Sequence, residues 1–377
     1  MKKSRITLVL AITLLLCVGC GEVKKYGAER FTTTIYEPQY ASGFVVDADD
    51  EGNTIIRVSQ PWQGSVVEEQ TLAIFNSKDA ARGYEGEYIL GAATRIVCMS
   101  TSYIAMLDAV GMEGAVVGVS GKQYVMNERV VANPKVKDVG YDSNLNYELL
   151  VSLNPDVVLM YGVTAENGAV TAKLRDLGIP YLYLGDYVEE SPLGKAEWLV
   201  AIAEIAGCRE RGVAQFEAIE ERYNAVKAGV QRSEQAPKVM FNLPYQDVWY
   251  MPSDESYMVQ LVTDAGGDYI YRGKNTSRGS RAVSLEEAYM LVADADIWLN
   301  AGQCSTMNDL RSAAPHFVNT RVVQSGEVYN NNCRRTKAGG SDFWESAIVR
   351  PDVVLRDLAT IIAGGEGELY YYYQQLR

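Results

Sequence analysis

Tyrosines at the ends of predicted strands are the side chains best placed to bind a ligand. Tyr161 follows the apolar run 157–160 and precedes Gly162, a sequence typical of the end of a strand. Tyr103 and Tyr141 also follow predicted strand or loop segments. In α/β sheets, the carboxyl ends of the strands face the crevice in which ligands bind. We therefore interpret these three tyrosines as candidate ligand contacts, while ordinary half-buried positions are the alternative in a chain with 25 tyrosines.

Trp249 is a further aromatic candidate in the second half of the chain. It lies in the apolar run 248–251, whose pattern is typical of a strand. An indole ring can bind a ligand, but a buried strand also uses tryptophan for core packing. The sequence is compatible with both interpretations.

Two loops concentrate positive charge in a chain whose net charge is −13. Their basic residues are Arg272, Lys274, Arg278 and Arg281 in the first loop and Arg334, Arg335 and Lys337 in the second. Guanidinium groups bind anionic groups through charge-assisted hydrogen bonds. We interpret Arg281, Arg334 and Arg335 as candidate contacts to an anionic ligand, and solvated loops are the alternative.

The motifs of common enzyme and metal sites do not occur in the sequence. His316 is the single histidine, and no GxSxG motif accompanies it, which argues against a Ser-His-Asp triad. The HExxH motif, the phosphate-binding loop GxxxxGK(S/T) and a strand-linked GxGxxG are also absent. A single histidine disfavours a preformed zinc site. We therefore expect no catalytic residue, no bound metal, no cofactor and no enzymatic activity.

Length and composition indicate a globular protein with more than one domain. The chain has 377 residues, of which 47% are hydrophobic and 22% charged, enough for two domains of ordinary size. A pI near 4.8 argues against general nucleic-acid binding, because such binding relies on a basic surface. An acidic surface instead favours a basic partner.

The N-terminus has the pattern of a secretory signal. Basic residues precede an apolar run from 6 to 18, which is too short to span a bilayer comfortably. The segment 16–20, LCVGC, resembles a bacterial lipobox, in which the final cysteine carries lipid in the mature protein. We therefore predict a signal peptide over 1–19, lipidation of Cys20 and a mature protein anchored to a membrane.

Four cysteines remain in the predicted mature chain beyond the lipidated residue. They are Cys98, Cys208, Cys304 and Cys333, and no CxxC pair occurs. Disulfides are possible in an exported protein. Cys98 and Cys208 lie in apolar patterns, however, where buried free thiols are an equal alternative.

The segment 191–207 is predicted to be a connecting helix. Ser191 can cap its free amide groups, and Pro192 suits the first helical position. Apolar residues follow at helical spacing, and Gly207 ends the helix before a second helical run over 209–228. We expect a stiff connector between two domains, with the second run belonging to the C-terminal one.

Strand and helix patterns alternate on both sides of this connector. Such alternation predicts mainly parallel sheets covered by helices, here in a lobe over 93–190 and another over 208–377. Residues 38–92 are β-rich and predict a small antiparallel extension, preceded by a polar tether over 20–37. The terminal tyrosine run 370–373 is interpreted as the end of a helix.

The segment 153–159, LNPDVVL, resembles a sequence motif found in the substrate-binding proteins of ABC importers. Together with the lipobox, the two lobes and the connecting helix, it is similar to the class with a rigid helical backbone, which includes siderophore-, haem- and cobalamin-binding proteins. The likeness covers about 93–363, and the extension is absent from the shortest members. It implies a protein that binds its ligand between two lobes and passes it to a permease with its ATPase.

The resemblance also implies roles for single residues. In this family each lobe presents a surface glutamate to arginines of the permease. The matching positions are Glu148 and Glu286, with Glu287 as a neighbouring alternative to the second. Favourable interaction with a helix dipole is the structural alternative for both. Tyr161 matches the position of a cleft tryptophan in cobalamin-binding relatives, and Tyr103 lies in the first binding loop of the family.

From this resemblance we expect a monomeric, lipid-anchored protein on the periplasmic side of a bacterial cell membrane. The expected ligand is an iron complex, either a ferric siderophore or haem, because the basic loops suit an anionic chelate. Cobalamin is the alternative ligand. A different class, an extracytoplasmic enzyme or an adhesin on the same fold, stays open because fold does not fix function.

Overall fold

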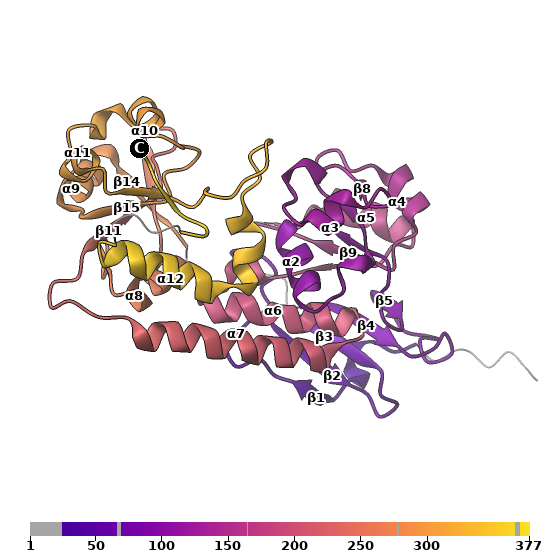
Figure 1. Ribbon diagram of the computed structural model, residues 1–377. Coiled ribbons are helices and arrows are strands. Elements are labelled where there is room, and N and C mark those ends of the chain that lie inside the picture. Colours follow the sequence, from indigo (N-terminus) through magenta and orange to yellow (C-terminus); the bar gives the residue numbers. More distant parts are fainter. Residues whose placement is uncertain (1–24, 66–68, 164, 277–278, 366–369) are drawn as a thin grey trace, which may run out of the picture.

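The computed structural model describes residues 25–65, 69–163, 165–276, 279–365 and 370–377. The predicted signal peptide and Cys20 lie outside the described residues. Within these ranges, no helix combines the length and the apolar character needed to cross a membrane. The described chain forms two α/β lobes, a helix that joins them and an N-terminal sheet (Figure 1).

The first lobe contains a parallel five-stranded sheet with strand order β10-β9-β6-β7-β8. Its strands are β6 (Ile96–Cys98), β7 (Val116–Val119), β8 (Lys137–Asp138), β9 (Val157–Met160) and β10 (Tyr181–Tyr183). Its helices are α2 (Thr101–Ala109), α3 (Glu128–Ala132), α4 (Tyr147–Leu153) and α5 (Gly168–Asp176). Every residue of the central strand β6 and of its neighbour β9 is buried, as expected where helices cover both faces of a parallel sheet.

The second lobe contains a five-stranded sheet with strand order β13-β11-β15-β16-β17. The strands are β11 (Lys238–Phe241), β13 (Asp268–Tyr269), β15 (Ile297–Leu299), β16 (Val328–Asn330) and the antiparallel edge strand β17 (Gln374–Gln375). A separate antiparallel pair joins β12 (Val248–Met251) to β14 (Arg281–Ser284). The helices are α8 (Tyr257–Asp264), α9 (Leu285–Asp294), α10 (Met307–Ala313), α11 (Arg321–Ser325) and α12 (Pro351–Ile362). The predicted fold class, two α/β lobes with mainly parallel sheets, is confirmed.

The connecting helix α6 (Pro192–Ile205) is buried along almost its whole length. The Ser191 hydroxyl accepts a hydrogen bond from the Gly194 N–H at 2.9 Å, so the helix begins with the cap that the sequence predicted. The next helix, α7 (Arg209–Gly229), packs against both α6 and α12 (Figure 1). A helix buried on all sides has several packing partners, which explains why α6 is apolar nearly all round.

The N-terminal extension forms a third sheet that packs against the first lobe and α6 (Figure 1). Its strands are β1 (Thr33–Tyr36), β2 (Phe44–Ala48), β3 (Thr54–Val58), β4 (Gln70–Phe75) and β5 (Tyr88–Leu90). They are antiparallel except for the β4–β5 pair. The prediction of a tether up to residue 37 is wrong for β1, which is polar because it is an exposed edge strand that pairs with β2.

Two buried glutamates hold the start of this extension against the linker. Glu197 on α6 is 1% exposed, and it accepts hydrogen bonds from the Tyr36 hydroxyl at 2.7 Å and from three backbone N–H groups of residues 39–41 at 2.8 Å. Glu189 accepts from the N–H groups of Ser42 and Gly43 and from the Trp198 indole at 2.9 Å. The carboxylates therefore satisfy backbone donors that would otherwise be buried without partners.

The C-terminal tyrosine run is not the end of a helix, so that prediction is wrong. The Asp357 carboxylate on α12 accepts hydrogen bonds from the backbone N–H groups of Tyr371, Tyr372 and Tyr373. Tyr372 and Tyr373 are fully buried, and the chain then enters β17. The run bends at Tyr371 and Tyr372 and leads into the last strand of the sheet.

The four cysteines beyond residue 20 are free in this structure. Cys98 and Cys304 are buried, whereas Cys333 is exposed. Burial raises the pKa of the Cys98 thiol well above its ordinary range, which keeps the thiol neutral and unreactive. Of the two alternatives that the sequence left open, the structure has free thiols.

Replacing Glu197 by Gln tests the attachment of the extension. The amide has one acceptor oxygen and places an NH₂ group against backbone donors, so we expect the free energy of unfolding to fall by about 3 kcal/mol. Urea denaturation measures this loss. The matched control Glu217→Gln, on the exposed side of α7, should change stability by less than about 0.5 kcal/mol. Equal effects of the two substitutions would contradict the proposed role of Glu197.

Candidate ligand-binding cleft

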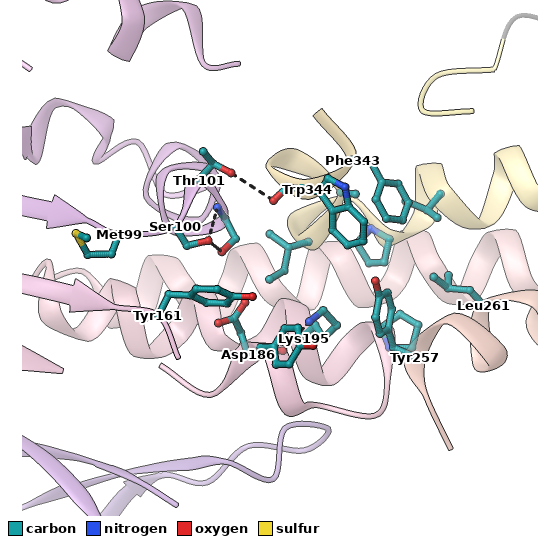
Figure 2. Close-up of a pocket in the computed structure, with 17 residues that line it drawn as sticks. Met99, Ser100, Thr101, Tyr161, Asp186, Lys195, Tyr257, Leu261, Phe343 and Trp344 are labelled. Atoms are coloured by element: carbon teal, nitrogen blue, oxygen red, sulfur yellow. Dashed lines mark hydrogen bonds between the residues drawn. The ribbon is translucent and has the colours of Figure 1, made fainter. Parts of the chain in front are cut away.

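A cleft lies between the two lobes and beside the linker helix. It consists of two adjoining hollows of about 340 Å³ each, with Tyr187, Tyr257 and Trp344 in the walls of both. Figure 2 shows the first hollow, whose lining comes from both lobes and from α6. Together the hollows have the size of a cleft for a small organic ligand.

Aromatic side chains from both lobes form the walls (Figure 2). Tyr161 and Tyr187 come from the first lobe and contact edge to face, with ring centroids 5.9 Å apart. Tyr257 and Trp344 come from the second lobe, and Trp344 is 60% exposed. Burial raises the pKa of Tyr161 and of Tyr257, so both phenols are neutral at neutral pH. These walls can stack on a flat ligand and donate hydrogen bonds to it.

Two charged residues meet on the linker side of the first hollow (Figure 2). Lys195 on α6 donates from Nζ to the backbone oxygen of Asp186 at 2.6 Å, and this ammonium lies 4.8 Å from the centre of the Tyr257 ring. Burial lowers the pKa of Lys195, although the carboxylates of Asp186 and Glu189 oppose this shift. Burial also raises the pKa of Asp186, against the effect of Lys195. Each charge is therefore only partly compensated by the other.

The N-terminal extension supplies part of the second hollow. Gln60, Trp62 and Gln63 line it, from the connection between β3 and β4. The Trp62 ring packs edge to face on Tyr183 at 5.3 Å, and the Gln63 N–H donates to the Val163 carbonyl at 3.1 Å. The extension is thus attached to the first lobe at the cleft and contributes an aromatic wall to it.

Direct contacts join the lobes next to the cleft. The Met126 N–H of the first lobe donates to Glu345 Oε2 of the second lobe at 2.7 Å. The Thr101 hydroxyl donates to the Trp344 carbonyl at 3.5 Å (Figure 2). Glu345 is 3% exposed, and burial raises its pKa to about 7. The structure therefore has the lobes in contact.

Tyr161 is the predicted aromatic residue that lines the cleft. Tyr103 is fully buried behind it and donates its hydroxyl to the Met160 carbonyl at 3.0 Å. Tyr141 is 40% exposed and accepts a hydrogen bond from Gln123 outside both hollows. Trp249 is fully buried, where its ring packs against Trp298 and Phe317, so its core interpretation matches the structure.

The predicted arginines lie outside the two hollows. Arg281 donates to the Lys274 carbonyl at 2.8 Å, and Arg334 pairs with Asp342 at 2.9 Å. Arg335 is exposed. No arginine lines the hollows in the part of the chain that the structure describes. Lys195 is therefore the cation that the described lining offers to a ligand.

The predicted docking glutamates are both exposed, in the first turns of α4 and α9. Glu148 lies on the first lobe and Glu286 on the second, and the two helices are at the outer ends of their lobes (Figure 1). Hydrogen bonds from its own backbone N–H and from the Ser284 hydroxyl lower the pKa of Glu286. Each lobe therefore exposes the predicted carboxylate at the start of a helix, with Glu287 exposed beside Glu286.

Sequence reasoning missed the remaining cleft residues. Among them are Trp62, Asp186, Tyr187, Lys195, Tyr257 and Trp344. Pro192 at the start of α6 and Ser256 before α8 lie close to Lys195 and Tyr257 in the sequence. A helix-capping signal does not indicate, however, which face of the helix borders a cleft. His316 is exposed, and the described residues contain no group of His, Cys, Asp and Glu that could hold a metal ion.

Comparison with known proteins gives a family model and several similar chains. A model described as "Periplasmic binding protein" matches residues 96–331. An uncharacterised lipoprotein of Methanocaldococcus jannaschii is 28% identical over 281 residues, which are 71% of this chain and 65% of that relative. The match therefore covers less than two thirds of the relative's own length.

Solved structures with a similar fold come from bacteria. A periplasmic heme binding protein from Pseudomonas aeruginosa has a TM-score of 0.58 at 17% identity, covering 76% of this chain and 98% of that one. A siderophore binding protein from Vibrio cholerae, solved with Fe³⁺–Desferal, has a TM-score of 0.53 at 17% identity, covering 71% and 99%. At this level of identity, the two similarities show a shared fold.

Glu345 should make stability depend on pH. Its pKa in the folded protein, about 7, lies above the ordinary 4.5 because of burial and the nearby Asp342 and Asp108, against the N–H groups of Met126 and Asn127. The folded state therefore holds a proton that the unfolded state has lost, so stability falls as pH rises from 4.5 to 7. We expect this residue to remove about 2 kcal/mol between pH 5 and pH 8.

The check is urea denaturation of the wild type and of Glu345→Gln at both pH values. The variant carries a neutral group throughout, so the difference in stability between the two proteins should change with pH by the stated amount. An identical pH dependence in both proteins would show that Glu345 does not titrate in this range.

Proposed function

The chain belongs to the periplasmic binding protein family, and on that basis we propose that it captures a metal chelate in its cleft and delivers it to the permease of an ABC importer. The observation that carries this proposal is the aromatic cleft between two lobes that a single buried helix connects. Neutral phenols and an indole suit an organic ligand with flat faces. Binding and transfer, rather than catalysis, are the activity of such a site.

An iron complex is the ligand that we propose. Two proteins of the same fold are described as binding heme and as holding Fe³⁺–Desferal. Trp344 and Tyr161, on opposite lobes, offer ring faces and edges to such a chelate. Cobalamin is the second candidate, because Tyr161 lies in the cleft at the position that resembles the tryptophan of cobalamin-binding relatives.

The exposed surface around Glu148 and Glu286 supports their proposed role in docking to the permease and its ATPase. Val151 lies three residues after Glu148 on α4 and is 51% exposed, and Met290 lies four residues after Glu286 on α9 and is 74% exposed. Residues at these spacings share a helix face. Each lobe thus combines a carboxylate with an exposed apolar side chain, a pattern that suits a protein partner.

The lipid anchor on Cys20 is proposed from the lipobox and from the lipoprotein that this chain resembles. A lipidated N-terminus followed by the β-sheet extension would hold a monomer beside the membrane, on its outer face. From there, the docking surfaces of the two lobes could reach a permease.

Tryptophan fluorescence tests ligand capture. Of the five tryptophans, Trp198, Trp249 and Trp298 are fully buried, whereas Trp62 and Trp344 line the cleft. Titration with haemin, ferrioxamine E and cyanocobalamin should therefore quench the emission for at least one probe at micromolar concentration. Lack of binding to all three would contradict the chelate proposal.

Trp344→Ala should weaken the bound probe about tenfold, because it removes an aromatic wall of the cleft. Trp344→Phe is the matched control, since it keeps an aromatic face while removing the indole emission. We expect its affinity to stay within about threefold of the wild type. Calorimetric titration measures both variants without relying on the indole. Equal affinities of the Ala variant and the wild type would remove Trp344 from the site.

Reversing the docking charges separates capture from delivery. The double variant Glu148→Arg/Glu286→Arg should bind the probe with unchanged affinity, because both residues lie outside the cleft, while uptake into cells should be lost through repulsion by a basic permease surface. Glu217→Arg, at an exposed position of α7, is the control variant and should retain uptake. Normal uptake by the double variant would contradict the assignment.

A further inference from the structure

The Asp186 carboxylate lines the first hollow with an oxygen that has no hydrogen-bond partner. The residue is 4% exposed, and its Oδ1 atom is buried without a partner in the structure. Buried carboxylate oxygens are normally hydrogen-bonded, since leaving one unsatisfied costs about 1 to 3 kcal/mol. Such an atom in the lining of a binding cleft is a candidate acceptor for a ligand donor.

Lys195 provides the complementary donors beside this carboxylate. One hydrogen bond from its ammonium goes to the backbone oxygen of Asp186, and an ammonium has three donors in total. Among the described residues, no ion pair within 4 Å joins the Lys195 ammonium to the Asp186 carboxylate, although the two charges attract each other. A ligand can therefore form a separate hydrogen bond with each group, donating to the Asp186 carboxylate and accepting from the Lys195 ammonium.

The chemistry of the pair decides which ligand group fits. A carboxamide offers an N–H donor next to a carbonyl acceptor, which satisfies both residues at once. A carboxylate offers only acceptors, so it would attract Lys195 but face the Asp186 charge at close range. Surrounding charges add to this difference, because Glu189 and Glu190 line the neighbouring hollow and no described arginine does.

We propose that Asp186 and Lys195 form a specificity subsite that binds a carboxamide of the chelate and discriminates against a carboxylate. This inference rests on the proposed function, since it assumes that the cleft binds a chelate. It revises the expectation of an anionic ligand, which depended on arginines that lie outside the cleft.

Amide groups of this kind occur in two chelate classes. A hydroxamate siderophore such as ferrioxamine E carries amides in its backbone and no charged end group. A corrinoid such as cyanocobalamin carries amides around its ring. Haemin, with its two propionates, is the carboxylate probe against which both are compared.

The test measures dissociation constants of the mature protein and its variants for the three probes. The wild type should bind one amide probe more tightly than haemin. Asp186→Asn should weaken that amide probe about tenfold and leave haemin unchanged or tighter, because the repulsive charge is gone. Lys195→Met should change the ratio of the two affinities in the opposite direction, because haemin loses its cation.

Controls separate recognition from folding. Asp79→Asn makes the same change in charge at an exposed position of the extension and should leave the ratio unchanged. Circular dichroism and melting temperature show whether each variant is folded, and Lys195→Met still tests the subsite if Asp186→Asn does not fold. Ferrioxamine E and cyanocobalamin distinguish the two sources of the amide.

Two results would overturn the subsite while the proposed function stands. One is tighter wild-type binding of haemin than of either amide probe, and the other is an affinity ratio that the two substitutions leave unchanged or move in the same direction. Failure of every probe to bind any of these proteins would instead overturn the proposed function, and the subsite with it.

Discussion

The buried carboxylate of Glu197 is the interaction on which the arrangement of this protein depends. It lies on the helix that joins the lobes, and its oxygens accept hydrogen bonds from the first segment of the N-terminal sheet. Glu189, just before that helix, holds the adjoining residues and the Trp198 indole. The linker helix therefore packs against both lobes and the N-terminal sheet, and it is buried along almost its whole length.

A linker of this kind determines how the cleft can act. The same helix that carries Glu197 on one side presents Lys195 to the cleft on another, so the charged subsite is fixed relative to the sheet and to both lobes. The Glu345 contact adds a second connection between the lobes. Recognition by rigid walls favours ligands that match a preformed shape, and lobe movement on binding should be small.

The sequence predicted the fold well because local signals carried it. The Ser191 cap, the alternating apolar runs and the glycine stops gave the helices and the parallel strands, and Tyr161 followed from the rule that strand ends face the crevice. Local signals failed where distant segments meet. Trp344 and Tyr257 reach the cleft from different parts of the second lobe, and nothing in the sequence near Lys195 shows which face of a buried helix borders it. The basic loops are charged, as the sequence shows, but Arg334 and Arg281 form their contacts within the second lobe, to Asp342 and to the Lys274 carbonyl.

The hold of Glu189 and Glu197 on the extension has a consequence for evolution. Without residues 36–43, both carboxylates would be left beside the linker with few donors, an arrangement that selection removes quickly. A homologue that lacks the sheet must therefore carry other side chains at these two positions, and one that keeps both acids must keep the sheet. We therefore expect the pair of glutamates to mark the members of the family that carry the N-terminal sheet.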